Sequence, residues 1–308
     1  MQNPIISVVL GSYNRLKFLT LTIESITKEL INFPHEIIIV DGGSNDGTIE
    51  WLLKQKNIIT IIQHNKGKWK NKKITPRSWG YFMNLGFKCT QGKYVCMLSD
   101  DCLVIPGAIK NGYELFEKEL KKEKKIGAVA FYFRNWSIKK KYHVSTPLGN
   151  KIYVNHGLYL KKALIDVGFI DEKTFAFYCA DIDLCFKIWN KGYECISSEN
   201  SYIEHYPHAN LKTRKKNIKK ATNDLIAFRN KWQNIFTEID NHNVGFIKEK
   251  EYFDKYLTAE KFNFLHKKTI RENKKYFQPP TLFQIIYSTI RWKCKMMWRK
   301  IKTIFLFF

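Results

Sequence analysis

Two adjacent carboxylates, Asp100 and Asp101, stand directly after an apolar run in this sequence of 308 residues. The run Tyr94–Leu98 follows Gly92, which is typical of a buried strand in a parallel sheet, although a buried helix segment shows the same pattern. Ligands of open α/β sheets bind beyond the carboxyl ends of the strands. Adjacent carboxylates repel each other, and their hard oxygens suit Mg²⁺ or Mn²⁺ that is shared with substrate phosphates. The pair is therefore a candidate metal site; the alternative is a solvated loop in which one of the two caps a helix near Pro106.

A second acidic pair, Asp181 and Asp183, lies at the start of a predicted helix. The apolar stripe of this helix consists of Ile182, Cys185, Phe186 and Trp189. Asp181 then falls in the first turn, where the helix macrodipole favours an anion. At about 100° per residue the two carboxylates point in well-separated directions, so a shared role does not follow from their proximity in sequence. Asp181 is either a functional carboxylate or a plain helix cap.

Histidine and cysteine are the other side chains that bind metals. His205 and His208 follow a short predicted strand near Ile196, and either is a ligand or part of a basic surface. The seven cysteines include no pair at the spacing of zinc ligands. Most of them lie in apolar runs, which indicates buried free thiols in a reducing compartment.

Strands that alternate with helices must position these residues. The predicted strands are Ile5–Leu10, Ile37–Val40, Ile58–Ile62, Tyr94–Leu98 and Ile126–Phe133, and the main predicted helices are Leu16–Leu30, Ile49–Lys54, Arg77–Cys89 and Pro106–Lys122. This alternation predicts a mostly parallel, doubly wound sheet. Right-handed crossovers place the loops after the strands on one edge, so Tyr13, Asp41 and the acids at 100–101 should converge in one cleft.

The loops after the first two strands exclude two large enzyme classes. The sequence contains no Gly-x-Gly-x-x-Gly after the first strand and no Gly-x-x-x-x-Gly-Lys-Ser/Thr, which argues against dinucleotide dehydrogenases and P-loop enzymes. The loops offer instead the ring of Tyr13, which can stack on a base, and the carboxylate of Asp41, which can accept hydrogen bonds from a base or ribose. For Tyr13 the alternative is an ordinary loop aromatic.

The charge of the chain is strongly positive and unevenly distributed. There are 52 Lys and Arg against 28 Asp and Glu, a net charge of +24, and the part from His205 onward holds 23 of the basic and 8 of the acidic residues. Such a balance indicates anionic partners. The sequence predicts basic amphipathic helices over Thr213–Trp232 and Lys248–Lys268.

The segment Thr281–Phe308 is predicted to be an amphipathic helix that lies in an anionic membrane interface. Basic residues follow one face, apolar residues another, and Trp292 and Trp298 flank them. The alternative is a helix docked on the protein's own core or on a partner. The first residues lack the features of a signal peptide, and no apolar stretch is long enough to span a membrane. We therefore expect a cytoplasmic protein that associates peripherally with the cytoplasmic face of the membrane.

Several motifs occur in the order found in family 2 glycosyltransferases, a large family of inverting enzymes, and the chain resembles this family from Ile5 to His208. The matching segments are Val8–Arg15, Ile38–Thr48, Asn84-x-Gly86, Gly92–Tyr94, Ser99–Asp101 and Ala180–Asp183. The segment Ile38–Thr48 is the most specific of them. Two positions depart from the pattern: Ser99 stands where many members have the first aspartate of the Asp-x-Asp (DXD) motif, and Ala180 stands where many have glutamate.

The resemblance implies an α/β protein with the GT-A (Rossmann-like) fold: a mixed, mostly parallel sheet flanked by helices, with a helical basic C-terminal extension. Residues 1–210 would form the glycosyltransferase domain, with a nucleotide-binding half (1–102) and an acceptor half (103–210). Residues 211–278 would form the basic helical extension, and residues 279–308 the amphipathic membrane-interface helix.

The resemblance also implies a metal-dependent, inverting transfer of hexosyltransferase type that uses Mn²⁺ or Mg²⁺. Asp101 and His205 would bind the metal, and Asp181 would remove the proton of the acceptor hydroxyl. The residues expected at the nucleotide-sugar are Gly11, Tyr13, Arg15, Asp41, Arg77, Ser99 and Asp100. The expected donor is a UDP-sugar, and the expected acceptor is a glycan or lipid-linked hydroxyl in the biosynthesis of a cell-surface polysaccharide or lipopolysaccharide-type glycan.

Three alternatives remain at this point. The positive charge and 15% aromatic residues would suit a nucleic-acid-binding protein, but no recognised motif accompanies them, so no nucleic acid is expected as a partner. A sugar-phosphate nucleotidylyltransferase would have a Gly-rich, Arg-containing pyrophosphate loop after the first strand, and Gly11–Arg15 is not one. A catalytically inactive homologue is the third alternative, for which Ser99 and Ala180 are the only hints.

Overall fold

The computed structural model describes residues 3–136, 141–207, 217–236, 246–252 and 260–272. The chain divides into two compact units, Met1–Leu265 and His266–Phe308. In the described part of the second unit, residues 266–272 form the end of a helix. All predicted site residues belong to the first unit.

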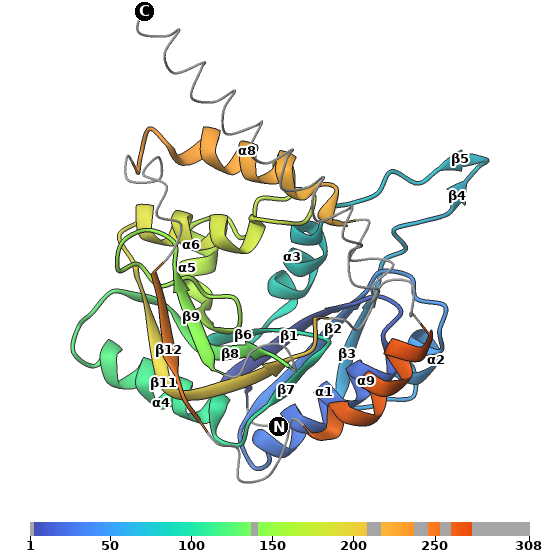
Figure 1. Ribbon diagram of the computed structural model, residues 1–308, viewed down its shortest axis with the longest axis horizontal. Helices are drawn as coiled ribbons and strands as arrows, with labels where there is room; N and C mark the ends of the chain where they lie inside the picture. Colours follow the sequence, from blue (N-terminus) through green and yellow to red (C-terminus); the bar gives the residue numbers. More distant parts are fainter. Residues whose placement is uncertain (1–2, 137–140, 208–216, 237–245, 253–259, 273–308) are drawn as a thin grey trace, which may run out of the picture. The chain divides into compact units, whose positions relative to one another are not determined.

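The first unit is built around a mixed β-sheet (Figure 1). Its strands are β1 (Ile6–Ser12), β2 (His35–Asp41), β3 (Ile58–Ile62), β6 (Tyr94–Ser99), β7 (Cys102–Val104), β8 (Ile126–Asn135), β9 (Tyr142–Thr146), β10 (Gly157–Leu160), β11 (Glu194–His205) and β12 (Phe246–Lys250), and β4 (Lys68–Trp69) with β5 (Lys72–Lys73) forms a separate hairpin. The helices are α1 (Leu16–Glu29), α2 (Thr48–Leu52), α3 (Trp79–Cys89), α4 (Ala108–Leu120), α5 (Lys161–Asp166), α6 (Ala180–Asn190), α8 (Ala221–Trp232) and α9 (Lys261–Glu272).

The strands follow the order β12-β9-β8-β10-β6-β1-β2-β3, with β11 beside β8 and β7. The pairs β6–β1, β1–β2 and β2–β3 are parallel, and antiparallel pairs begin where β10 joins β6. The predicted mixed, mostly parallel sheet flanked by helices is confirmed.

The register of the parallel strands brings the predicted loops to one edge. Gly11 of β1 pairs with Ser99 of β6, and Ser12 pairs with Asp41 of β2. All three strands therefore end at the same level, and the chain that follows each of them leaves the sheet side by side. The prediction that Tyr13, Asp41 and Asp100 lie at one edge is confirmed.

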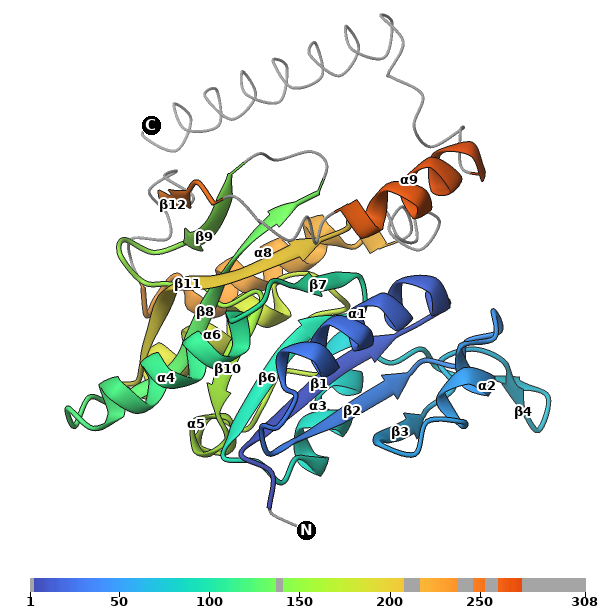
Figure 2. The same cartoon turned by 90° about the horizontal axis from the view of Figure 1, so that it is seen from below.

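Strand β1 is buried on both faces, which is why its sequence reads as a continuous apolar run. Successive side chains of a strand point to opposite faces. Val8 accordingly packs in the cluster that contains the apolar face of α1, and Val9 packs in the cluster that contains α3. Helices α1 and α3 thus cover opposite faces (Figure 2). Gly86 allows α3 to approach closely, because a Cβ there would lie 2.5 Å from Val9 Cγ1.

The helix after Pro106 is capped by a residue far away in sequence. Glu29, at the end of α1, accepts hydrogen bonds from the backbone N–H groups of Gly107, Ile109 and Lys110 at 2.6, 3.0 and 3.1 Å. Three backbone donors at the start of α4 are therefore satisfied by Glu29, and a fourth, the N–H of Ala108, bonds the carbonyl of Ile105. The alternative in which Asp100 or Asp101 caps this helix is wrong.

The C-terminal third required one correction. The helix predicted over Lys248–Lys268 is wrong in its first part, because Phe246–Lys250 form strand β12, which pairs antiparallel with β9. The reason is tertiary: β9 would otherwise expose the unpaired backbone groups of an edge strand, which a helix cannot bond. Helix α9 begins only at Lys261.

Other predictions fall partly or wholly outside the described residues. These include His208 and the amphipathic helix Thr281–Phe308. In the part of the chain that the structure describes, no helix has both the length and the apolar character to cross a bilayer. The six cysteines within that part are free thiols, and four of them are buried as predicted, whereas Cys89 is exposed and Cys179 is partly exposed.

Candidate active site

The loops after β1 and β2 are held together by side chains of the predicted motif segments. Ser44 Oγ accepts a hydrogen bond from the backbone N–H of Asn14 at 2.8 Å, and Asn14 Oδ1 accepts one from the N–H of Asn45 at 2.8 Å. Asp46 Oδ2 accepts from the N–H of Leu16, the first residue of α1, at 3.1 Å. The polar residues of the 41–48 segment therefore fix the position of the chain that carries Tyr13 and the start of α1.

Asp41, predicted to hold the nucleotide, is fully buried and bonded within its own loop. Its Oδ1 accepts from the N–H groups of Gly43 and Ser44 at 2.8 and 2.7 Å, and its Oδ2 accepts from Ser44 Oγ at 2.6 Å. Gly43 lies at φ 85°, in the left-handed region that favours glycine. The observed contacts of the Asp41 carboxylate thus shape the loop after β2.

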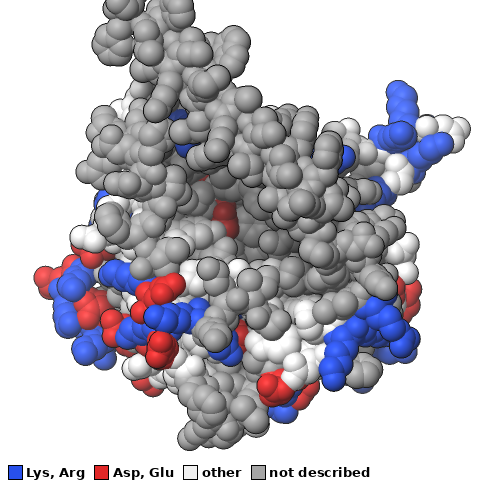
Figure 3. All heavy atoms as spheres, in the orientation of Figure 1, with Lys and Arg blue, Asp and Glu red and all other residues white. Residues whose placement is uncertain are grey.

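Tyr13 contacts Lys66, which lies just before the β4–β5 hairpin. Lys66 Nζ is 4.0 Å from the centroid of the Tyr13 ring and also donates a hydrogen bond to its hydroxyl. The lysines of this hairpin are exposed, and the hairpin projects from the sheet as a basic arm (Figure 3). One face of the ring predicted to stack on a base is therefore covered by a cation.

Three other residues predicted at the nucleotide-sugar lie on the same side of the sheet. Gly11 and Ser99 are paired neighbours near the ends of β1 and β6. Arg77 is exposed on the loop before α3, where its backbone bonds Asn65, and its guanidinium lies 5.2 Å from the Tyr81 ring centroid. No contact between Arg77 and the other predicted donor residues occurs within the described part of the chain.

The acidic pair after β6 is buried and shares one guanidinium. Nη1 of Arg15 lies 2.6 Å from Oδ1 of Asp100 and 2.8 Å from Oδ2 of Asp101. The two aspartates are 3% and 2% exposed, so their repulsion is screened little by water, and a cation is needed to hold both ionised. The structure thus brings Arg15, Asp100 and Asp101 together as predicted, with Arg15 bound to the acids.

The pKa values at this pair follow from burial and from the shared cation. Burial raises the pKa of Asp100, the Arg15 charge opposes that rise, and the neighbouring Asp101 adds to it. Burial alone would lower the pKa of Arg15, but the two carboxylates outweigh it and raise the pKa. A cation beside the pair lowers the electrostatic cost of keeping both carboxylates charged, and Arg15 supplies one.

His205 approaches the same pair from the end of β11. Its Nε2 lies 3.5 Å from Oδ1 of Asp101, and its Nδ1 lies 2.6 Å from Asn135 Oδ1. In the neutral tautomer that carries its proton on Nδ1, His205 donates to Asn135, and the lone pair of Nε2 is then available to a metal. The backbone N–H of Tyr206 also bonds the carbonyl of Asp101 at 2.8 Å, which fixes the two segments relative to each other.

These residues fit a divalent cation that is shared with a substrate. Within the described residues no three His, Cys, Asp or Glu side chains form a group that could hold a metal by itself. Mg²⁺ and Mn²⁺ commonly need only one or two carboxylates when phosphates and waters complete the shell. Oδ2 of Asp100 is a buried oxygen with no hydrogen-bond partner among the described residues, as expected where a further ligand is to be bound.

Asp181 is a partly buried carboxylate that two side chains from another segment hold in place. The hydroxyl of Tyr153 donates a hydrogen bond to its Oδ2, and Asn155 Nδ2 lies 3.3 Å from the same oxygen. Oδ1 accepts from the N–H of Ile182 at 3.0 Å. Burial raises the pKa of Asp181, and these three hydrogen bonds oppose the rise. The residue at the N-cap of α6 is Cys179, so Asp181 is not the cap.

Asp183 has a different environment, as its direction on the helix predicted. It is fully buried and accepts hydrogen bonds from Trp232 Nε1 at 2.7 Å and from Lys231 Nζ. Lys231 also bonds Asp171 at 2.8 Å. Asp183 is therefore a structural group that anchors α8, whereas Asp181 faces Tyr153 and Asn155.

Asp181 and the acidic pair are connected through the chain before β10. Gly157 of β10 pairs with Met97 of β6, so Asn155 lies beside the carboxyl end of β6. His156, between them in sequence, packs its ring 5.4 Å from that of His205. Asn155, which bonds Asp181, and His205, which lies beside Asp101, thus occupy one edge of the sheet.

The sequence interpretation did not include Tyr153, Asn155 or Lys66. Tyr153 and Asn155 lie in an irregular segment that shows no periodic pattern, and only the pairing of β10 with β6 brings them to the site. The basic residues between His64 and Thr75 mark the segment that contains Lys66, but nothing in that segment predicts the contact with Tyr13.

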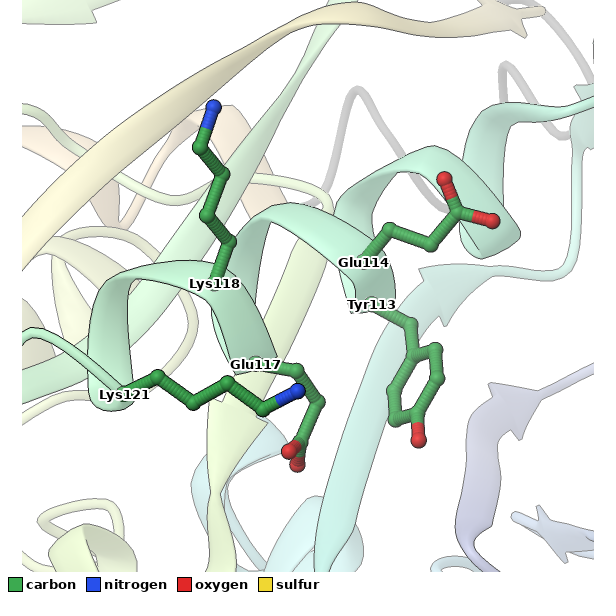
Figure 4. Close-up of a pocket in the computed structure, with 5 residues that line it drawn as sticks. All are labelled: Tyr113, Glu114, Glu117, Lys118 and Lys121. Atoms are coloured by element: carbon green, nitrogen blue, oxygen red, sulfur yellow. The ribbon is translucent and has the colours of Figure 1, made fainter.

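A separate hollow of about 490 Å³ lies on the outer surface of α4. It is lined by Tyr113, Glu114, Glu117, Lys118 and Lys121 (Figure 4). Tyr113 contacts Tyr94, the first residue of β6, whereas Asp100 follows its last residue. The hollow is therefore at the opposite end of the strand from the acidic pair, and it is not part of the site.

One known protein family matches the N-terminal part of the chain. The family model described as "Glycosyl transferase family 2" matches residues 7–183. The match covers every predicted site residue except His205.

Curated relatives share short segments with this chain. The chondroitin synthase of Pasteurella multocida is 26% identical over 105 residues, which is 33% of this chain and 10% of that protein. The glycosyltransferase GlyG of Streptococcus pneumoniae is 28% identical over 121 residues, which is 38% of this chain and 36% of GlyG. The matches thus span about a third or less of the length of these relatives.

Two solved structures share the fold. That of Staphylococcus aureus TarS, residues 1–349, has a TM-score of 0.50 at 16% identity and covers 77% of this chain and 73% of TarS 1–349. The mannosyltransferase PcManGT from Pyrobaculum calidifontis, solved with GDP-Man and Mn²⁺, has a TM-score of 0.51 at 15% identity and covers 94% of this chain and 80% of that one. At such identities the likeness concerns the fold.

Proposed function

The chain belongs to glycosyl transferase family 2, and on that premise we propose that it transfers a sugar, with inversion, from a nucleotide-diphosphate donor to a hydroxyl of a glycan or lipid-linked acceptor. The observation that supports this proposal is the arrangement at one edge of the sheet. Buried Asp100 and Asp101 share the guanidinium of Arg15 there, and His205 lies beside Asp101. Asp181 is held by the adjoining segment through Asn155. One end of this site suits a diphosphate, and the other suits an attacking hydroxyl.

Asp181 is the proposed base. A general base must be ionised and must reach the proton that it removes. Its raised pKa makes it a stronger proton acceptor than an exposed aspartate, and the hydrogen bonds from Tyr153 and Asn155 orient the carboxylate. Attack by the deprotonated hydroxyl on the anomeric carbon, from the face opposite the diphosphate, inverts the configuration in a single displacement.

Asp101 and His205 are the proposed ligands of Mn²⁺ or Mg²⁺, which when bound neutralises charge on the leaving diphosphate. Arg15, which forms ion pairs with both acids, is proposed to contact the same diphosphate, because a planar guanidinium binds phosphate oxygens well. Asp100 is proposed to hold the ribose, and Tyr13 to stack on the base. The loop bonds of Asp41 make it the residue that places Tyr13, in addition to any contact that it makes with the nucleotide.

A UDP-sugar is the proposed donor, and biosynthesis of a cell-surface polysaccharide or lipopolysaccharide-type glycan is the proposed setting. The polysaccharide setting is supported by the chondroitin synthase relative, although the match covers a tenth of it. The chain is also proposed to work in the cytoplasm at an anionic membrane surface that it contacts through residues 281–308.

The test is a panel of UDP- and GDP-sugars, titrated into the full chain by calorimetry with Mn²⁺ and with EDTA. We expect one donor to bind in a metal-dependent manner, and Asp101→Ala to remove the metal dependence. Glu114→Ala, in the hollow on α4 that is not part of the site, serves as a control with an intact acidic pair. Donor affinity that is the same with Mn²⁺, with EDTA and in Asp101→Ala would contradict the assignment of the metal site.

A further inference from the structure

Helix α8 lies beyond the segment that matches the family, yet it holds the chain that leads to Asp181 (Figure 1). Asp224, in the first turn of α8, is 3% exposed. Its Oδ1 accepts from the backbone N–H of Ala176 at 2.9 Å, and its Oδ2 accepts from those of Phe177 and Tyr178 at 3.0 and 2.8 Å. Three successive N–H donors therefore converge on one buried carboxylate.

These donors belong to the residues directly before α6. Cys179 follows them with φ 65°, a left-handed conformation that is uncommon for a residue other than glycine. Helix α6 has no side-chain cap of its own. Hydrogen bonds from N–H groups to an ionised acceptor are stronger than neutral ones, so the Asp224 carboxylate can hold this turn. This contact can therefore fix the direction in which α6 starts. Asp181 is the second residue of α6, so its position follows from that direction.

A second residue of α8, Lys231, forms ion pairs with both ends of the segment from Asp171 to Asp183. Lys231 Nζ lies 2.8 Å from Asp171 Oδ2 and 2.9 Å from Asp183 Oδ1. The rings of Phe186 on α6 and Phe228 on α8 pack with centroids 4.9 Å apart. The chain from residue 171 to residue 183 is thus held by α8 at both ends.

We propose that Asp224 is a positioning residue for the acceptor step: by binding the backbone of 176–178 it holds Asp181 where the acceptor hydroxyl is deprotonated. This inference rests on the proposed role of Asp181 as the base. It also assigns α8, part of the region predicted from sequence to be an extension, to the working enzyme. The donor loops after β1, β2 and β6 make no hydrogen bond to Asp224 among the described residues, so we expect the donor affinity to change little when Asp224 is replaced.

The test compares Asp224→Asn with Glu29→Gln. Glu29 is a matched control because it is also a buried carboxylate that accepts three backbone N–H bonds, but at α4 and not at α6. In both variants the amide retains one acceptor oxygen and turns an NH₂ group toward an N–H donor. We expect similar losses of thermal stability in the two proteins.

The turnover number kcat should distinguish Asp224→Asn from Glu29→Gln. In Asp224→Asn we expect kcat for transfer to fall at least tenfold with the KM for the donor unchanged, and in Glu29→Gln we expect kcat to stay near that of the wild type. Adding Asp224→Asn to Asp181→Asn should cost nothing further, because a residue that acts through the base has no effect once the base is gone. Lys231→Gln keeps Asp224 intact but removes the contacts to Asp171 and Asp183, so we expect a smaller fall in kcat, within about tenfold. This variant serves if Asp224→Asn does not fold.

The failures are distinguishable. Transfer that survives Asp181→Asn would overturn the proposed base and the positioning role with it. Transfer lost in Asp181→Asn but normal in Asp224→Asn and Lys231→Gln, or lowered equally by Glu29→Gln, would overturn the positioning role alone.

Discussion

Nη1 of Arg15 lies 2.6 Å from Oδ1 of Asp100, and the same nitrogen is 2.8 Å from Oδ2 of Asp101. One residue of the first loop thus forms ion pairs with both acids that follow β6, 85 and 86 positions later in the chain. The contact joins two loops that were each predicted to bind the donor. A metal ion or a diphosphate that enters the site would therefore meet the Arg15 guanidinium already bound to Asp100 and Asp101.

Removal of this guanidinium should destabilise the protein and increase its response to metal. In Arg15→Met two buried carboxylates lose their shared cation, and we expect the free energy of unfolding to fall by about 2 kcal/mol. A divalent cation can replace the lost charge, so Mn²⁺ should raise the melting temperature more in Arg15→Met than in the wild type. Thermal unfolding with and without Mn²⁺ measures both effects. Arg15→Lys, which retains a charge, is the control, and equal Mn²⁺ responses in all three proteins would argue against a cation site at the acids.

Asp181 and Asp183 should respond differently to the same substitution. Asp181→Asn removes the proposed base, and we expect transfer to fall by about a thousandfold with the donor Kd within about twofold of the wild type. Asp183→Asn disturbs the contacts to Lys231 and Trp232, so we expect about 2 kcal/mol of lost stability, with transfer retained within about tenfold. Initial rates, donor calorimetry and chemical denaturation distinguish the two. The role assigned to Asp181 would be wrong if Asp183→Asn were the more damaging to turnover at equal folded fraction.

The pH profile should move when Tyr153 is replaced. The Tyr153 hydroxyl lowers the pKa of Asp181 against the raising effect of burial, so Tyr153→Phe should raise that pKa. The base must be ionised, and activity is lost as the pH falls through its pKa. The acidic limb of kcat should therefore shift to higher pH in Tyr153→Phe, while kcat on the alkaline plateau stays within about threefold.

The groups around Asp181 support this assignment. Tyr153 remains protonated as the donor, because burial and Asp181 both raise its pKa. Burial, followed by the charge of Asp181, also raises the pKa of the Cys179 thiol. Neither group then titrates in the acidic limb. An unchanged limb in Tyr153→Phe would mean that another group controls it.

Residues 279–308 should control membrane binding. We expect the full chain to float with vesicles that contain phosphatidylglycerol and not with neutral vesicles, because basic residues are attracted to anionic lipid. A chain that ends at Gln278 should remain at the bottom of the gradient. The attraction should weaken as salt is raised toward 1 M, where charges are screened within about 3 Å. Flotation of the shortened chain equal to that of the full chain would refute the anchor.

The sequence by itself determined the alternation of strands and helices and the edge at which the site lies. Burial of β1 and β6 on both faces requires continuous apolar runs, and a run that ends in two acids shows where the strand ends. The order of motifs was sufficient to indicate the family, because these segments are local. The same locality explains why the helix at α6 and the first-turn position of Asp181 were predicted correctly.

Only the tertiary structure decided which polar groups meet. Arg15 is 86 positions from Asp101, Asn155 is 26 from Asp181, and Asp224 is 46 from Tyr178. A polar side chain in a loop or on a helix leaves no periodic signal of its partner, since its bond depends on how distant segments pack and not on its neighbours in sequence. For the same reason Lys248–Lys250 was predicted as helix: its pairing with the edge of β9 satisfies backbone groups that its own sequence does not reveal.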